Sequence, residues 1–194
     1  MRIGTVVNST SHIQYAVRIL GEKEAPQAPA PRDYGFGTFC GLRLADDGQL
    51  VGVIYDTVLH NPEYGNLGPR LSPRDELAVF SPDQLVEQAT LVSVLVVGAF
   101  DASGIPTQGV PSEAAVVGAP VEPLEPDDLV RFHTIEGRLQ VVYLQTLASM
   151  GHPLARPLMR RILERLMVLY PRDAGRLEVL GDNLAWKAAI EPLG

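Results

Sequence analysis

The feature that most constrains the fold of this chain is a change in hydrophobic spacing near residue 124. Before this point short apolar or alternating runs are separated by turn signals. Beyond it the apolar residues recur at the three- and four-residue spacing of helices. Short strands separated by turns are typical of a barrel and not of a doubly wound sheet. We therefore predict an α+β protein in which a small, closed N-terminal β-barrel of six to seven strands precedes a C-terminal helical bundle. The predicted domains are residues 1–124 and 125–194.

The predicted strands follow one another closely in the first part of the chain. The segment Asp46-Asp47-Gly48 predicts a hairpin, because an Asp-Gly pair readily adopts the positive φ angles of a tight turn. Residues 91–100, LVSVLVVGAF, are apolar on both faces, so we expect them to form the most buried strand. The predicted strands are 3–8, 14–20, 34–44, 50–59, 91–100, 116–117 and 121–124.

The predicted helices fill the second part of the chain. Residues 138–150, RLQVVYLQTLASM, are apolar almost all round, so we expect them to form the central helix of the bundle. Gly181 is expected to end one helix before another begins, as glycine often does. The predicted helices are 127–134, 138–150, 153–170, 172–180 and 183–190.

A long stretch rich in proline and glycine, Asn61–Asp83, separates two of the predicted strands. It also contains leucine, valine and phenylalanine residues that would anchor it, so we expect an ordered loop and not a solvated linker. Ordered loops often carry function, and the arginines of this one could pair with carboxylates of a partner. The alternative is that its polar groups satisfy the backbone of the loop itself. The predicted partner-binding residues are Tyr64, Asn66, Arg70, Arg74 and Asp75.

The sequence lacks the residue patterns that phosphate-binding and metal-dependent enzymes need. Neither of its two lysines, Lys23 and Lys187, follows a glycine-rich loop, which excludes a P-loop ATPase. The four histidines lack the spacing of a zinc site, and the single cysteine, Cys40, has no catalytic motif around it. We therefore predict a protein that is not an enzyme and that has no catalytic residue, no metal ligand and no cofactor.

Several tracts of the first part resemble the HAS barrel, a small β-barrel at the N-terminus of HerA-type hexameric DNA translocases that is related to the N-terminal barrel of F-type ATP synthase subunits. These tracts are the run from Arg2 to His12, YGFGTFCGLRL, LVGVIYDTVL, LVSVLVVGAFD and GAPVEPL, and the long loop is similar to that of stand-alone HAS-barrel proteins of bacteria. In HerA-type proteins this barrel serves assembly and docking, while a separate domain hydrolyses ATP. The resemblance therefore implies a non-enzymatic assembly or adapter protein. Its protein partner would be a second copy of itself, a HerA-type ATPase or a NurA-type nuclease, in DNA repair or processing.

An alternative function is the binding of single-stranded nucleic acid on an OB-like barrel face. Tyr15, Tyr34, Phe36 and Phe39 could stack on bases, although the same residues would also suit a barrel core. The formal net charge of −7 disfavours contact with phosphate backbones. The arginines of the second part would cover a broad helical arc, so we interpret them as a solvated helix face. They are Arg156, Arg160, Arg161, Arg165 and Arg172.

The start of the sequence lacks the long apolar segment of a signal peptide, and the longest apolar run is too short to cross a bilayer. We therefore expect a cytoplasmic protein without a membrane partner.

Overall fold

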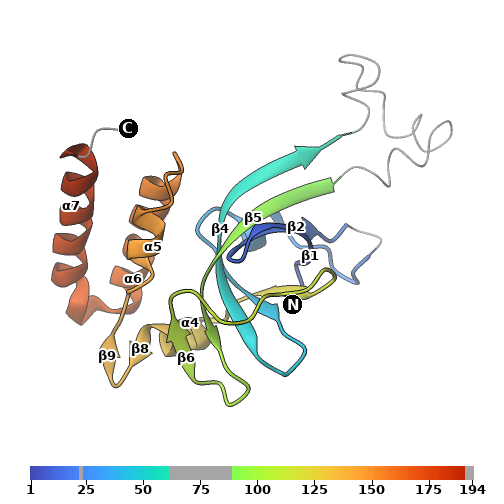
Figure 1. Ribbon diagram of the computed structural model, residues 1–194, viewed down its shortest axis with the longest axis horizontal. Coiled ribbons are helices and arrows are strands. Elements are labelled where there is room, and N and C mark those ends of the chain that lie inside the picture. Colours follow the sequence, from blue (N-terminus) through green and yellow to red (C-terminus); the bar gives the residue numbers. More distant parts are fainter. Residues whose placement is uncertain (22–23, 62–88, 191–194) are drawn as a thin grey trace.

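The computed structural model describes residues 1–21, 24–61 and 89–190. Its first part is a closed antiparallel β-barrel of six strands, with the strand order β2-β1-β7-β3-β4-β5 and a further pairing of β5 with β2 that closes the ring (Figure 1). A seventh strand, β6, pairs with β5 outside the ring. The predicted α+β class, N-terminal barrel and C-terminal helices are confirmed. The strands are β1 (Gly4–Ser11), β2 (Gln14–Ile19), β3 (Phe39–Arg43), β4 (Gln49–His60), β5 (Ala89–Phe100), β6 (Pro106–Gln108) and β7 (Pro120–Pro123).

The interior of the barrel is filled by alternate residues of its strands. On β2, Tyr15, Val17 and Ile19 are buried on the face that points into the barrel. On the neighbouring strand β5, Val92, Val94 and Val96 are buried in the same cluster. Such alternation is what a strand with one face toward a core requires. The rest of this inner cluster consists of Ile3, Val6, Cys40, Leu42, Leu50, Ile54, Ala119 and Val121.

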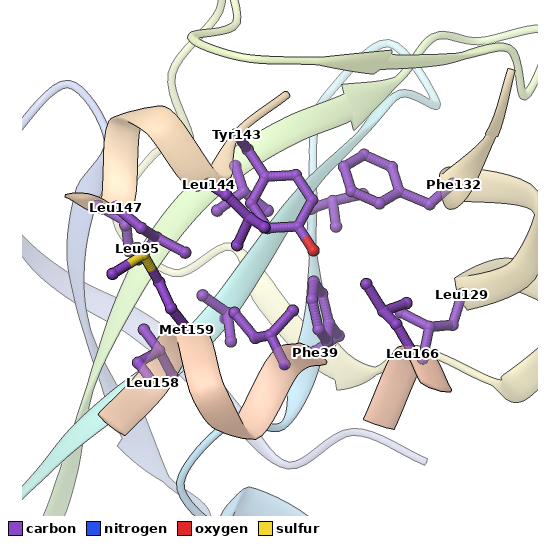
Figure 2. Packing of buried hydrophobic residues seen from close by; sticks show 14 of the residues in the cluster. Phe39, Leu95, Leu129, Phe132, Tyr143, Leu144, Leu147, Leu158, Met159 and Leu166 are labelled. Carbon is purple, nitrogen blue, oxygen red and sulfur yellow. The ribbon is translucent and has the colours of Figure 1, made fainter. Parts of the chain in front are cut away.

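The intervening residues of β3, β4 and β5 form a second, outer cluster with the helical part. Phe39, Val53 and Leu95 from the strands pack there with side chains such as Leu129 and Leu158 (Figure 2). Strand β5 is therefore buried on both faces, as its sequence predicts, because one face lines the barrel and the other lies under the helices.

The helical part begins directly after β7 and lies against one side of the barrel (Figure 1). The predicted change from strands to helices near residue 124 falls between Pro123 and Pro126, and the outer cluster joins the two parts into one continuous core. The elements are α4 (Pro126–His133), the hairpin β8 (Thr134–Ile135) and β9 (Arg138–Leu139), α5 (Leu144–Ala148), α6 (Ala155–Leu169), a 3₁₀ turn η2 (Pro171–Asp173) and α7 (Ala174–Ile190).

Two of the strand predictions are wrong. The predicted strand 34–44 begins only at Phe39, because Pro31–Tyr34 is a 3₁₀ turn (η1) and Gly37 has a φ of +81°, which is incompatible with extended backbone. Residues 116–117 form no strand, since both valines are exposed in the turn that leads to β7. The predicted Asp46-Asp47-Gly48 hairpin is confirmed between β3 and β4, with the positive φ of 65° at Asp47.

Two of the helix predictions are also wrong. The predicted helix 138–150 is broken into β9, a turn and the short α5, because Glu136 and Gly137 both have positive φ and form a tight hairpin turn ahead of it. Gly181 does not end a helix but lies inside α7, where a Cβ atom would be 3.2 Å from Leu163 Cδ1. Glycine at this position allows α7 to pack closely on α6. No helix in the described ranges is long and apolar enough to span a membrane.

Candidate functional sites: a strand ribbon, a two-arginine groove and a buried histidine

The outer parts of β4 and β5 form a paired ribbon that extends beyond the rest of the barrel (Figure 1). Strand β5 keeps β2 as its other neighbour as far as Leu91, so the last two pairs of the ribbon, Leu59 with Thr90 and His60 with Ala89, lie beyond β2. The pairing continues from Asp56 opposite Ser93 to His60 opposite Ala89. Strand β3 pairs with β4 only as far as Val53, so β4 has no strand neighbour on its outer edge along the ribbon within the described residues. Val58 and Leu59 on this strand are 51% and 76% exposed. The ribbon therefore offers a strand edge together with exposed apolar side chains.

The five predicted partner-binding residues lie outside the described residues. Tyr64, Asn66, Arg70, Arg74 and Asp75 all belong to the stretch between the two ribbon strands, and their role remains a prediction from the sequence. The described residues on either side of that stretch, His60 and Ala89, are paired with each other.

A groove of about 460 Å³ lies between the turn before β3 and the C-terminal half of α6. Its turn side consists of Phe36, Gly37 and Thr38. Two backbone hydrogen bonds hold this turn on β4, because Gly37 N–H donates to the Ile54 carbonyl at 2.8 Å and Ile54 N–H donates to the Thr38 carbonyl at 2.9 Å. These bonds fix the backbone of the turn, so the turn side of the groove has a defined position relative to β4.

The helix side of the groove carries two arginines, Arg161 and Arg165, which are one helical turn apart on α6 and so share a face. The face that includes Leu158, Ile162 and Leu166 is buried in the outer cluster. Arg161 is 64% exposed, whereas Arg165 is partly buried. Burial and the nearby charge of Arg161 lower the pKa of the Arg165 guanidinium.

A buried histidine lies at the end of α4, inside a ring of aromatic side chains. The centroid of the His133 ring is 5.4 Å from that of Phe39, 5.1 Å from that of Phe132 and 5.6 Å from that of Tyr143. The Leu129 carbonyl can only accept a hydrogen bond, so His133 Nδ1–H donates to it at 2.8 Å and Nε2 accepts from the Tyr143 hydroxyl at 2.7 Å. Burial lowers the pKa of His133 to about 4, and the positive charge of Arg165 contributes to this shift.

The comparisons with known proteins concern the chain as a whole. A family described as Domain of unknown function (DUF8166) matches residues 1–192. The chain belongs to this family. No curated protein matches the chain. The DUF8166 match spans both the barrel and the helical part, and its description gives no activity, so the resemblance to HAS barrels stays a prediction.

The aromatic residues considered for base stacking in this DUF8166 chain do not share one surface. Tyr15 is buried in the inner cluster, where its hydroxyl donates to the His12 carbonyl at 3.0 Å and accepts from Ala115 N–H at 3.1 Å. Phe39 is buried in the outer cluster, and Tyr34 is partly buried beside the inner one. Phe36 alone among the four is exposed, and it lies in the groove.

The residues considered for chemistry are placed by the structure as follows. Cys40 is buried inside the barrel, and burial raises the pKa of its thiol to about 12, so the reactive thiolate is strongly disfavoured. Within the described ranges no three His, Cys, Asp or Glu side chains are grouped so that they could hold a metal ion.

The sequence interpretation missed the groove because its two sides are far apart in the chain. The sequence pattern places Arg161 and Arg165 on one broad helix face with Arg156, Arg160 and Arg172, whereas of these five arginines only Arg161 and Arg165 line the groove. The spacing of four residues between them was the signal available on the helix side. The turn side could not be found from the sequence, because the close approach of Gly37 to Arg161, where a Cβ atom would be 2.7 Å from Arg161 Cγ, exists only in the fold.

Proposed function

We propose that this protein is a non-enzymatic assembly or adapter protein that docks on a protein partner through the β4–β5 ribbon. The observation that carries the proposal is the outer edge of β4, which has no strand neighbour in the described part of the chain, beside the exposed Val58 and Leu59. An open strand edge can accept a strand from another chain through backbone hydrogen bonds, and apolar side chains beside it add specificity. Proteins normally protect such edges from unwanted pairing, so an apolar edge supports a role in association.

The resemblance to HAS barrels supports a choice of partner. It favours a HerA-type ATPase or a NurA-type nuclease in DNA repair or processing, with self-association as the other possibility. The absence of a P-loop in the sequence fits a chain that relies on a partner for ATP-dependent chemistry.

The test uses the full chain and two substituted forms. Val58→Lys combined with Leu59→Lys would place two charges on the ribbon, while Val116→Lys combined with Val117→Lys places the same two charges on an exposed turn elsewhere on the barrel. We expect the ribbon variant to bind its partner at least about tenfold more weakly, as expected when apolar anchors of an interface are lost. The variant with lysine at Val116 and Val117 should bind like the unmodified chain.

Sedimentation velocity reports self-association, and pull-down with the HerA-type ATPase and the NurA-type nuclease of the same organism reports the other two partners. A chain that stays monomeric at high concentration and captures neither protein would contradict the proposal. Reversal of charge at Arg70 and Arg74 tests the sequence prediction for the adjoining stretch separately, and it should weaken docking without lowering the thermal stability of the fold.

A further inference from the structure

The groove between the Phe36–Thr38 turn and α6 lies outside the ribbon and contains groups that neither the fold nor the proposed docking explains. We propose that it binds a carboxylate side chain, Asp or Glu, of a protein partner, together with an apolar residue next to it. The inference rests on the proposed function only in that the occupant belongs to a protein. It adds a second contact surface and states the chemistry of the partner segment.

Arg165 is the central group of this site. It is partly buried, it lines the groove, and no residue in the described ranges forms an ion pair or hydrogen bond with its guanidinium. Burial without a partner is unfavourable for a charge, which is consistent with the lowered pKa of this side chain. A carboxylate would satisfy it well, because the planar guanidinium can donate two parallel hydrogen bonds to the two carboxylate oxygens.

Arg161 adds a second positive charge beside Arg165. Its aliphatic part lies against Gly37, where any side chain would collide with it, so the glycine makes room for this arginine at the mouth of the groove. Gly37 also has a φ of +81°, which favours glycine for a second and independent reason. The turn and the helix are thus matched to each other at this point.

The acidic residue in the groove does not neutralise Arg165. Glu164 accepts a hydrogen bond from Arg160 at 3.1 Å with one carboxylate oxygen, and its other oxygen lies 3.8 Å from Arg161. Both of its oxygens are therefore engaged by arginines other than Arg165. Two arginines against one shared glutamate leave the groove with a net positive charge, on a protein whose total formal charge is −7.

The rim of the groove explains why the occupant should be a peptide. Phe36 is exposed on one side and Val168, which is 81% exposed, lies on the other, so apolar groups flank the two cations. An apolar residue beside the acidic one would cover them. A nucleic acid strand would bring phosphates at regular intervals, which the negative charge of the whole chain opposes. A single carboxylate would interact with the positive groove without bringing further negative charges close to the rest of this acidic protein.

The test measures binding of short labelled probes to the full-length protein by fluorescence anisotropy. The probe is a fluorescein-labelled peptide with one glutamate next to one leucine in an otherwise glycine- and serine-based sequence, compared with a peptide in which glutamine replaces this glutamate and with a labelled oligothymidylate. We expect the acidic peptide alone to bind. Arg165→Gln should weaken its binding by about tenfold or more, the scale of a charged hydrogen bond, and Arg161→Gln by a smaller factor.

Two further variants make the result specific. Arg165→Lys keeps the charge but loses the paired donors, so it should fall between the native protein and Arg165→Gln. Arg172→Gln removes the same charge from an exposed position that does not line the groove, and it should leave binding unchanged. Thermal melting establishes whether each variant is folded. If Arg165→Gln is not folded, the binding of Arg165→Lys is compared with that of the native protein instead.

Three outcomes would overturn the inference. The first is no binding of the acidic peptide to the native protein at millimolar concentration, and the second is equal binding of this peptide by the Arg165→Gln and native proteins. The third is tighter binding of the oligothymidylate than of the acidic peptide, provided that Arg165→Gln abolishes it. The ribbon variant should bind the peptide normally. Failure of ribbon docking therefore leaves the peptide result intact, and failure of peptide binding leaves the docking result intact.

Discussion

At the scale of single residues, His133 is the one polar side chain in the described part of the chain that is fully buried. Both of its ring nitrogens are used, and the aromatic rings around it give a proton no compensating acceptor. The neutral form is therefore required for this packing. This role of His133 could not be predicted from the sequence. Tyr143 comes ten residues later, and it is the hairpin between them that brings its hydroxyl next to the histidine.

The first prediction follows from the lowered pKa of His133. Because its pKa is about 4 in the folded chain and 6.5 in the unfolded chain, the unfolded chain takes up the proton first as the pH falls. The contribution to stability is complete above pH 6.5 and is lost between pH 6.5 and 4, by about 3 kcal/mol in total. Urea unfolding of the native chain at several pH values should show this loss.

The control for this prediction is His133→Gln, which cannot titrate. It should be less stable than the native chain at pH 7.5, and the difference between the two should shrink as the pH falls toward 4.5. Carboxylates contribute equally to both proteins and cancel in the comparison. If the two stabilities run parallel across this range, His133 does not control the acid sensitivity of the fold.

At the scale of elements, β6 is the shortest barrel-associated strand but holds several segments together. The side chain of Gln108 donates from Nε2 to the carbonyls of Phe132 at 3.1 Å and Gln140 at 2.9 Å, and its Oε1 accepts from Val142 N–H at 2.9 Å. One amide group thus joins the end of α4 to the chain that follows β9. This arrangement fixes the hairpin and, through it, the position of Tyr143.

The second prediction concerns this amide. Gln108→Ala removes three hydrogen bonds and should lower the free energy of unfolding by about 2–3 kcal/mol. Gln108→Glu should be at least as harmful, since a carboxylate cannot donate to the two carbonyls. The neighbouring Thr107→Ala is the matched control, because Thr107 is exposed and its hydroxyl donates a long hydrogen bond of 3.4 Å to the Ala99 carbonyl, so the cost of this change should stay below about 0.5 kcal/mol. Equal losses for Gln108→Ala and Thr107→Ala in urea unfolding would refute the role of the amide.

The elements also mark where sequence reasoning succeeds and where it fails. Strand β5 was predictable because its length and its apolar residues on both faces suit only a strand between two cores. Residues 138–150 were not predictable, because a run that is apolar almost all round suggests a fully buried helix, whereas Val142 is 52% exposed and the buried residues are Tyr143, Leu144 and Leu147. The available warning was Glu136-Gly137, a pair whose positive φ angles make a two-residue hairpin turn. The groove needed the fold itself, since Gly37 and Arg161 are neighbours only in space.

At the scale of the whole molecule, the barrel and the helices share one outer core. Six strand residues, Phe39, Val51, Val53, Leu95, Val97 and Phe100, are buried there by the helical part. Burying six such side chains contributes on the order of 10 kcal/mol, which is comparable with the total stability of an ordinary domain. The helical part is therefore expected to unfold together with the barrel and not separately.

The third prediction tests this coupling with a chain that ends after residue 124. We expect the shortened chain to lack a cooperative thermal transition, to bind a hydrophobic dye and to aggregate at concentrations where the full chain stays clear. Calorimetry and light scattering on the two chains give the comparison. A monomeric fragment that melts sharply near the temperature of the full chain would instead make residues 1–124 an independent domain.

The double burial of β5 has a consequence for synthesis on the ribosome. The inner face of this strand can be covered as soon as β7 emerges. Its outer face is covered first by Phe132 of α4, at Phe100, and the residues of α6 that complete the outer cluster follow much later in the chain. At roughly 5–20 residues per second, that interval lasts on the order of several seconds. During this time the outer face of β5 exposes its apolar side chains to solvent or to a chaperone. Because the helical part is translated last, we expect an unfinished chain to aggregate through the outer face of β5.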